Sequence, residues 1–193
     1  MSTATATLRV QSTQRVKNTE TVNCGLVLAA QDVLSQGLEL LESSKQSYAQ
    51  IAGSPFQSSI GQHYRHVLEH FQCLLEAAES GEVNYDARKR DRRIETEVSF
   101  AKSATCGLME ELRAWTTATL KERCTTISSV GYSSDLASTI PSNMGRELAY
   151  CIGHAIHHYA IIRLVCSQVG VDVSTSFGYA PSTIRHQNSH AAE

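Results

Sequence analysis

The sequence predicts an all-α fold, a four-helix bundle formed by one domain. The chain has 193 residues, which is enough for one domain with its own hydrophobic core. It contains only 3 prolines and 11 glycines, and this scarcity favours long helices over many short strands. Four segments also repeat apolar residues at the 3.6-residue period of an amphipathic helix. We expect the domain to cover residues 23–186, with disordered tails at 1–22 and 187–193.

The first two amphipathic segments lie in the N-terminal half of the chain. One runs from about Cys24 to Ile51, and the other from about Ser58 to Ser80 with Gly81 as its C-terminal glycine. The candidate core positions of these two segments recur at helical spacing. They are Leu26, Val33, Leu34, Leu38, Leu41 and Tyr48 in the first segment and Ile60, Tyr64, Val67, Phe71, Leu74, Leu75 and Ala78 in the second.

The other two predicted helices are separated by a loop rich in Ser and Thr. The third helix is expected from about Glu97 to Arg123, and the loop from Thr125 to Ser142, in which an extended stretch is left open. The fourth helix begins near Ser142 or Asn143, either of which can cap it, and ends before Gly170. The chain after that helix is expected to be irregular up to residue 185.

Charge and composition exclude several classes of partner. With 17 basic and 19 acidic residues the net charge is −2, so we expect neither nucleic acid nor a membrane surface as partner. The linker Tyr85–Glu97 contains a run of Arg and Lys that acidic residues balance, and we interpret this run as ion pairing or as a grip on an anionic substrate. Six cysteines without a CxxC pair indicate a reducing compartment, and no secretory signal or membrane span is visible. We therefore expect a cytoplasmic protein.

The histidines carry the strongest functional signal. His154 and His158 are spaced i and i+4 in the last predicted helix, about 40° apart on its surface. Their ring nitrogens can therefore converge on one ion. Both flank an apolar stripe of that helix, whereas His157 points away from it and is expected to face solvent or to support a ligand from outside the metal site.

The second predicted helix offers a third histidine ligand. His63, His66 and His70 form a stripe at i, i+3 and i+7, and helical geometry alone slightly favours His63 or His70. Each of the three could instead be an ordinary histidine at the edge of the core. For the whole constellation, metal binding is the better interpretation. Glu69 and Glu147 are candidates to orient a ring N–H of the site.

Four segments of the chain resemble the DinB/YfiT-like superfamily. They are IGQHYRHVLE at 60–69, ELAYCIGHAIHH at 147–158, the charged linker within 85–95, and FGYAPSTIR at 177–185. The resemblance covers most of the chain after about residue 24. It implies a four-helix bundle of up-down-down-up topology, with a metal held by one histidine of the second helix and two of the last.

The same resemblance implies which histidine of the second helix is the ligand. In that superfamily the first ligand is followed three residues later by an acidic residue, a pattern that His66 and Glu69 match. The implied metal ligands are therefore His66, His154 and His158.

Three neutral imidazoles suit one divalent transition metal, zinc before nickel or iron, and leave a coordination position open. The resemblance implies a metal-dependent transferase that uses a low-molecular-weight thiol, or a hydrolase, acting on a small-molecule substrate. The alternative is a non-catalytic metal- or ligand-binding module of a stress-response or sensor type. The sequence identifies no catalytic side chain, and it leaves open a homodimer and whether the protein is an enzyme.

Overall fold

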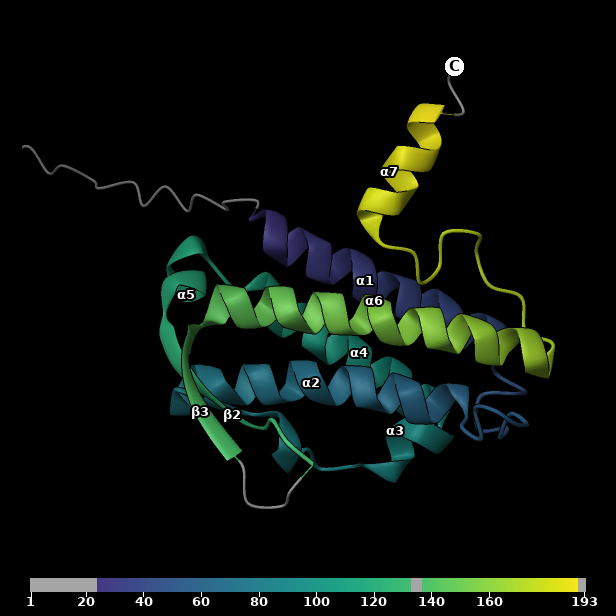
Figure 1. Cartoon of the computed structure of the whole chain (residues 1–193), viewed down its shortest axis with the longest axis horizontal. Coiled ribbons are helices and arrows are strands. Elements are labelled where there is room, and N and C mark those ends of the chain that lie inside the picture. The colour runs from purple at the N-terminus through teal and green to yellow at the C-terminus, as the bar shows by residue number, and fades with distance from the viewer. Residues whose placement is uncertain (1–23, 133–136, 191–193) are drawn as a thin grey trace, which may run out of the picture.

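The computed structural model describes residues 24–132 and 137–190 and is built around four long helices. These are α1 (Gly25–Ser43), α2 (Ile60–Ser80), α4 (Val98–Arg113) and α6 (Met144–Val169). Helix α1 packs against α4 and α6, and α2 packs against the same two helices (Figure 1). Their buried side chains, together with those of the connecting segments, form one apolar core whose members run from Val27 to Phe177.

A small mixed sheet accompanies the helices. Its strands are β1 (Glu82–Asn84), β2 (Arg123–Ser129) and β3 (Ala137–Asn143). Strand β2 is central: it pairs in parallel with β1 and antiparallel with β3, so that Thr126 lies between Val83 and Ile140. Because β1 directly follows α2 and β3 directly precedes α6, the sheet lies at the end where α2 finishes and α6 begins (Figure 1).

The prediction of an all-α four-helix bundle is wrong. The described residues contain seven α-helices and three strands, and β2 and β3 occupy most of the region that we expected to be a loop, in which an extended stretch is left open. Strand β2 has the sequence RCTTISS, whose β-branched Thr and Ile side chains favour extended backbone. Within it Cys124 and Thr126 are buried, at the two-residue spacing of a strand with one face on the core.

Two predicted helices are shorter than expected. Helix α1 ends at Ser43 instead of Ile51, although Tyr48 beyond it is buried and donates its hydroxyl to the Ile94 carbonyl at 2.6 Å. Helix α4 ends at Arg113, and a separate short helix, α5 (Thr117–Lys121), begins after a capping box at Thr116. The Thr116 hydroxyl accepts an N–H of the new helix, which competes with continuation of the old one.

The ends of the two histidine-bearing helices agree with the sequence. Helix α2 ends at Gly81, which has a φ of 73° in the left-handed region that glycine adopts without a steric cost. Helix α6 begins after Asn143, whose side-chain oxygen accepts the Arg146 N–H at 2.9 Å. It ends at Gly170, another left-handed glycine.

The charged linker contains two short elements, η1 (Tyr85–Ala87) and α3 (Arg92–Thr96). Helix α3 packs tightly on α2 at Gly61, where an added Cβ would lie only 2.0 Å from the Glu95 carbonyl oxygen. This close approach fixes the linker along α2, next to the histidines of that helix.

Residues 171–180 are irregular, as expected, but the described chain after them is helical, contrary to the irregular chain up to residue 185 and the disordered tail that we expected. Helix α7 (Pro181–His190) includes residues 187–190, has no buried side chain and stands away from the four long helices (Figure 1). The predicted tail at 1–22 and the last three residues lie outside the described part. Among the described helices none is both long and apolar enough to span a membrane.

Candidate metal centre

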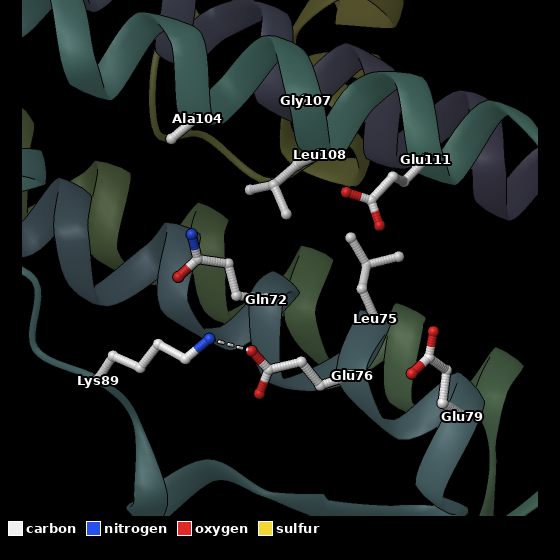
Figure 2. A pocket seen from close by; sticks show the side chains of 9 residues that line it. All are labelled: Gln72, Leu75, Glu76, Glu79, Lys89, Ala104, Gly107, Leu108 and Glu111. Carbon is white, nitrogen blue, oxygen red and sulfur yellow. Dashed lines mark hydrogen bonds and ion pairs between the residues drawn. The ribbon is translucent and has the colours of Figure 1, made fainter.

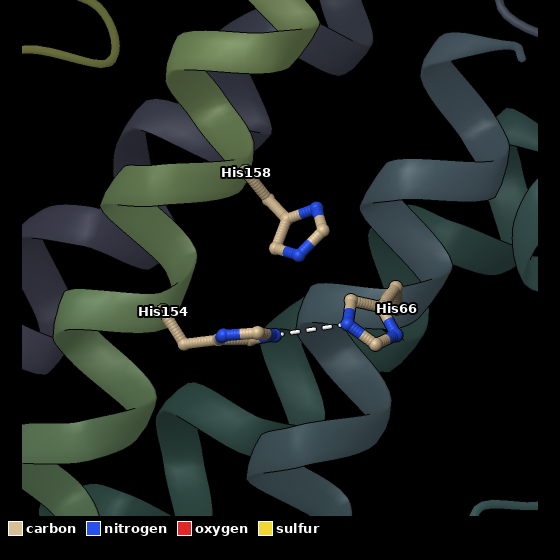
Figure 3. Close-up of side chains that lie close together, drawn as sticks. All are labelled: His66, His154 and His158. Atoms are coloured by element: carbon tan, nitrogen blue, oxygen red, sulfur yellow. Dashed lines mark hydrogen bonds between the residues drawn. The ribbon is translucent and has the colours of Figure 1, made fainter. Parts of the chain in front are cut away.

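Helices α2 and α6 lie side by side and bring the three implied ligands together. His66 comes from α2, and His154 and His158 come from successive turns of α6. One ring nitrogen from each can be chosen so that all three lie within 4.8 Å of one another (Figure 3). The closest pair is Nε2 of His66 and Nε2 of His154, at 2.9 Å.

The spacing of these nitrogens fits a transition metal. Zinc–nitrogen bonds of about 2.0–2.1 Å in tetrahedral geometry place two ligand nitrogens about 3.3–3.4 Å apart. The nitrogens of the cluster therefore need only small side-chain movements to surround an ion. The three-histidine cluster could hold one metal ion.

The electrostatics of the cluster favour neutral rings. Burial lowers the pKa of His66 to about 2, and the nearby rings of His70 and His158 add to this effect. Burial and then the ring of His154 lower the pKa of His158 to about 3, and burial also lowers the pKa of His154. A neutral imidazole keeps the lone pair that a metal requires, so the site is prepared for a cation.

His63 and His70, which helical geometry alone slightly favoured, lie beside the ligand set and outside it. Nδ1 of His63 is 3.1 Å from Nδ1 of His158, on the side of that ring away from the cluster. Nδ1 of His70 donates to the His66 carbonyl at 2.8 Å, and its ring stacks on Tyr85 with 5.1 Å between centroids. The packing of α2 on α6 thus turns His66 toward the ligands of α6.

The two carboxylates proposed to orient the ring N–H groups do not do so. Glu69 is buried, accepts the Asp91 backbone N–H at 2.8 Å and has Arg88 at 3.9 Å. Glu147 is fully buried and accepts hydrogen bonds from Tyr85 at 2.9 Å and Arg146 at 2.8 Å. In the described part of the chain, neither carboxylate bonds to a ring of the cluster.

A pocket of about 510 Å³ opens beside the cluster. It is lined by His66, His70 and His154, by the polar side chains of Tyr85, Asp86, Arg88, Arg146, Glu147 and Tyr150, and by residues of the sheet and its junction with α6, Thr126, Ser128, Ser129, Ile140, Pro141 and Ser142. The sheet that the sequence did not predict therefore forms one wall of the candidate site.

Most of the residues that give this pocket its chemistry were not recognised as site residues. Tyr85 and Arg88 belong to the linker, whose arginines the sequence could only assign to ion pairs or to an anionic substrate. The ion pairs are present, because Arg93 pairs with Asp91 at 2.6 Å, whereas Arg88 lines the pocket and the anionic substrate stays a prediction. The signal that could have identified Arg88 is its position in the basic run that follows the histidine-bearing helix α2.

Several other polar or nucleophilic groups near the histidines lie elsewhere. The Tyr64 hydroxyl is in the core, bonded to Thr105 at 2.8 Å, and His157 is exposed as expected. Burial raises the pKa of the Cys151 thiol to about 12, so this cysteine is not a thiolate near neutral pH. Arg163 donates to the Thr175 carbonyl at 2.9 Å.

A second pocket, of about 390 Å³, lies between α2 and α4, away from the histidines. Figure 2 shows Gln72 and Leu75 of α2 facing Leu108 of α4 across it, with the 2.5 Å ion pair between Lys89 and Glu76 at its rim. It contains no imidazole or thiol, so it offers no comparable metal chemistry.

Comparisons with known proteins give only a partial similarity. No family model and no solved structure matches the chain. A segment of 104 residues, 54% of this chain, is 34% identical to a protein named FK506-binding protein 5 from Rhizopus delemar. The match spans 27% of that protein, so it does not assign this chain to a family. The resemblance to the DinB/YfiT-like superfamily gains no support from these comparisons.

Proposed function

We propose that this protein is a metal-dependent enzyme that acts on a small molecule, with His66, His154 and His158 as the ligands of one divalent ion. One observation carries the proposal. The 510 Å³ pocket reaches His66 and His154, and it also presents Tyr85, Arg88 and Tyr150, which are not hydrogen-bonded to those ligands. A site that only stored an ion would need neither the space nor these groups.

The chemistry follows from the ligand set. Three imidazoles leave at least one coordination position open, and a divalent metal there lowers the pKa of a bound water or thiol toward neutrality. The proposed reaction is therefore hydrolysis or transfer to a thiol, with zinc favoured over nickel or iron. The protein's own contribution is to orient the ligands: the Tyr150 ring lies against that of His154, with centroids 5.5 Å apart and planes at 21°.

The proposed substrate is a small molecule that carries an acidic group, such as an anionic low-molecular-weight thiol. The Arg88 guanidinium donates to the Tyr85 carbonyl, which holds it at the pocket wall and leaves further N–H groups for a ligand. Arg146 lies across the same pocket, with its guanidinium carbon 5.6 Å from the centroid of the Tyr150 ring.

The alternative, a non-catalytic metal- or ligand-binding module, is supported by the state of the two carboxylates. Glu69 and Glu147 are both buried and accept hydrogen bonds from neighbouring groups of the protein, so both have a structural role without a substrate. A protein that senses a metal or a small anion could use the same cluster and pocket, because sensing requires binding and no proton transfer.

Untagged protein tests the proposal. We expect about one zinc per chain by elemental analysis, and hydrolysis or thiol transfer in a substrate panel after zinc, nickel or iron is restored. The measurement uses a His186→Ala/His190→Ala background, because that exposed i,i+4 pair on α7, with ring centroids 4.4 Å apart, could retain metal weakly. Metal without turnover would favour the binding module, and protein that takes up no metal would exclude the metal-dependent enzyme.

A further inference from the structure

His158 is the one ligand of the cluster whose outer nitrogen bonds to another side chain, within the residues that the structure describes. Its Nδ1 lies 3.1 Å from Nδ1 of His63, and Nε2 of His63 lies 2.9 Å from Oγ of Ser58. Figure 3 shows the other ring nitrogen of His158 turned into the gap between His66 and His154. A chain of three polar side chains therefore leads away from the metal position.

The two hydrogen bonds that link His158, His63 and Ser58 are compatible with metal binding only if the protons are donated from His158 to His63 and from His63 to Ser58. An Nδ1–Nδ1 contact needs one donor and one acceptor, because a neutral imidazole carries a single N–H. If His158 binds a metal through Nε2, its proton is on Nδ1, and it must donate to Nδ1 of His63. His63 then carries its own proton on Nε2 and donates it to the Ser58 hydroxyl.

We propose that His63 is a positioning residue for the metal site, which accepts the Nδ1–H of His158 and thereby fixes the orientation and tautomer of that ligand. The inference rests on the proposed metal-dependent function. Metal-bound histidines commonly donate their second ring N–H to such a partner, and loss of the partner typically costs about 10- to 100-fold in metal affinity.

The local structure holds His63 in the position that this role requires. Ser59 and Gln62 form the capping box that starts α2, so the first turn, which includes His63, has a fixed direction. Ser58 precedes that cap and is half-buried. His63 and Ser58 do not line the 510 Å³ pocket, so an effect of His63 on metal affinity cannot come from contact with a substrate there.

A matched pair of substitutions separates the hydrogen bond from the volume of the side chain. His63→Asn keeps an amide oxygen near the place of Nδ1, whereas His63→Leu has a similar size and no acceptor. We expect His63→Leu to weaken zinc binding about 10- to 100-fold and His63→Asn to restore most of that loss. His157→Leu, at the exposed neighbour of His158, is the control and should bind zinc like the unmodified protein.

Nitrogen NMR of the zinc-loaded protein gives an independent readout. We expect the His158 ring to be protonated at Nδ1 and bound through Nε2 in the unmodified protein and in His63→Asn. Equal zinc affinities of the Leu and Asn variants would overturn the role of His63. This holds if both affinities are unchanged, and it holds if both are weakened equally while the melting temperature of the metal-free protein falls. If the unmodified protein binds no zinc, the proposed function itself fails, which is a distinguishable result.

Discussion

Nε2 of His66 and Nε2 of His154 lie 2.9 Å apart although 88 positions separate the two residues in the sequence. The lone pairs of two imidazole nitrogens repel each other at this distance unless the nitrogens share one proton or one metal ion. It makes the cluster sensitive to metal, to pH and to single substitutions, and each sensitivity can be measured.

Removal of one ligand should abolish tight metal binding. We expect His154→Ala to lower zinc affinity by more than about 100-fold, which exceeds the effect of losing a hydrogen-bond partner of a ligand, because two remaining imidazoles hold an ion poorly. Isothermal titration of chelator-treated protein measures this change. His157→Ala, on the exposed side of the same helix, is the matched control; equal losses in both variants would argue against the assigned ligands.

Protons should compete with zinc less than free histidines would allow. Three unperturbed imidazoles with a pKa of about 6.5 would weaken zinc binding by roughly 1,000-fold between neutral pH and pH 5.5. Burial lowers the pKa of His66 to about 2 and that of His158 to about 3, so we expect a much smaller loss. Zinc affinity measured by competition with a chelator between pH 7.5 and 5.5 tests this. A loss near 1,000-fold would contradict the lowered pKa values.

The same lowered pKa values predict that the metal-free protein is destabilised by acid. In the unfolded chain these histidines gain a proton near pH 6.5, whereas in the folded protein the pKa of His66 is about 2 and that of His70 about 4. Between those values the unfolded state binds more protons, so the free energy of unfolding falls as the pH falls. Urea denaturation with chelator at pH 7.5 and 5 measures this slope. His66→Gln should reduce it, and an unchanged slope in that variant would count against the prediction.

Two neighbouring core tyrosines should respond differently to loss of the hydroxyl. The buried Tyr159 hydroxyl has no hydrogen-bond partner among the described residues, whereas that of Tyr64 bonds to Thr105 at 2.8 Å. We expect Tyr159→Phe to be neutral or stabilising and Tyr64→Phe to lower stability by about 0.5–1.5 kcal/mol. Thermal unfolding of the two variants side by side gives the comparison. A larger loss for Tyr159→Phe would mean that a buried water satisfies that hydroxyl.

Arg88 should contribute to binding of an anion by the zinc-loaded protein. We expect Arg88→Met to weaken the binding of inorganic phosphate about 10-fold, because a charge-assisted hydrogen bond in a partly buried pocket is lost. Arg93→Met is the control, since Arg93 pairs with Asp91 on the surface and does not line the pocket. Calorimetry with zinc-loaded protein measures both. Equal phosphate binding by the two variants would remove the argument for an acidic substrate.

Features that depend on local backbone geometry could be predicted from the amino-acid sequence. The i,i+4 spacing of His154 and His158 places both rings on one helix face wherever that helix lies. Gly81 and Asn143 mark helix ends because a left-handed glycine and a side-chain cap act within one turn. For these features no distant residue was needed.

Tertiary packing decided what depends on neighbours far away in the sequence. Three histidines of α2 were candidates for the third ligand. The packing of α2 on α6 turns His66 toward His154 and places His63 next to Nδ1 of His158. Strands β2 and β3 exist because each supplies the other with hydrogen-bond partners, and a period-two pattern of Thr and Ser is too weak to reveal that pairing in advance. The pocket, whose walls come from α2, η1, the sheet and α6, is therefore a product of the assembled fold, since no single segment contains enough of it to be recognised.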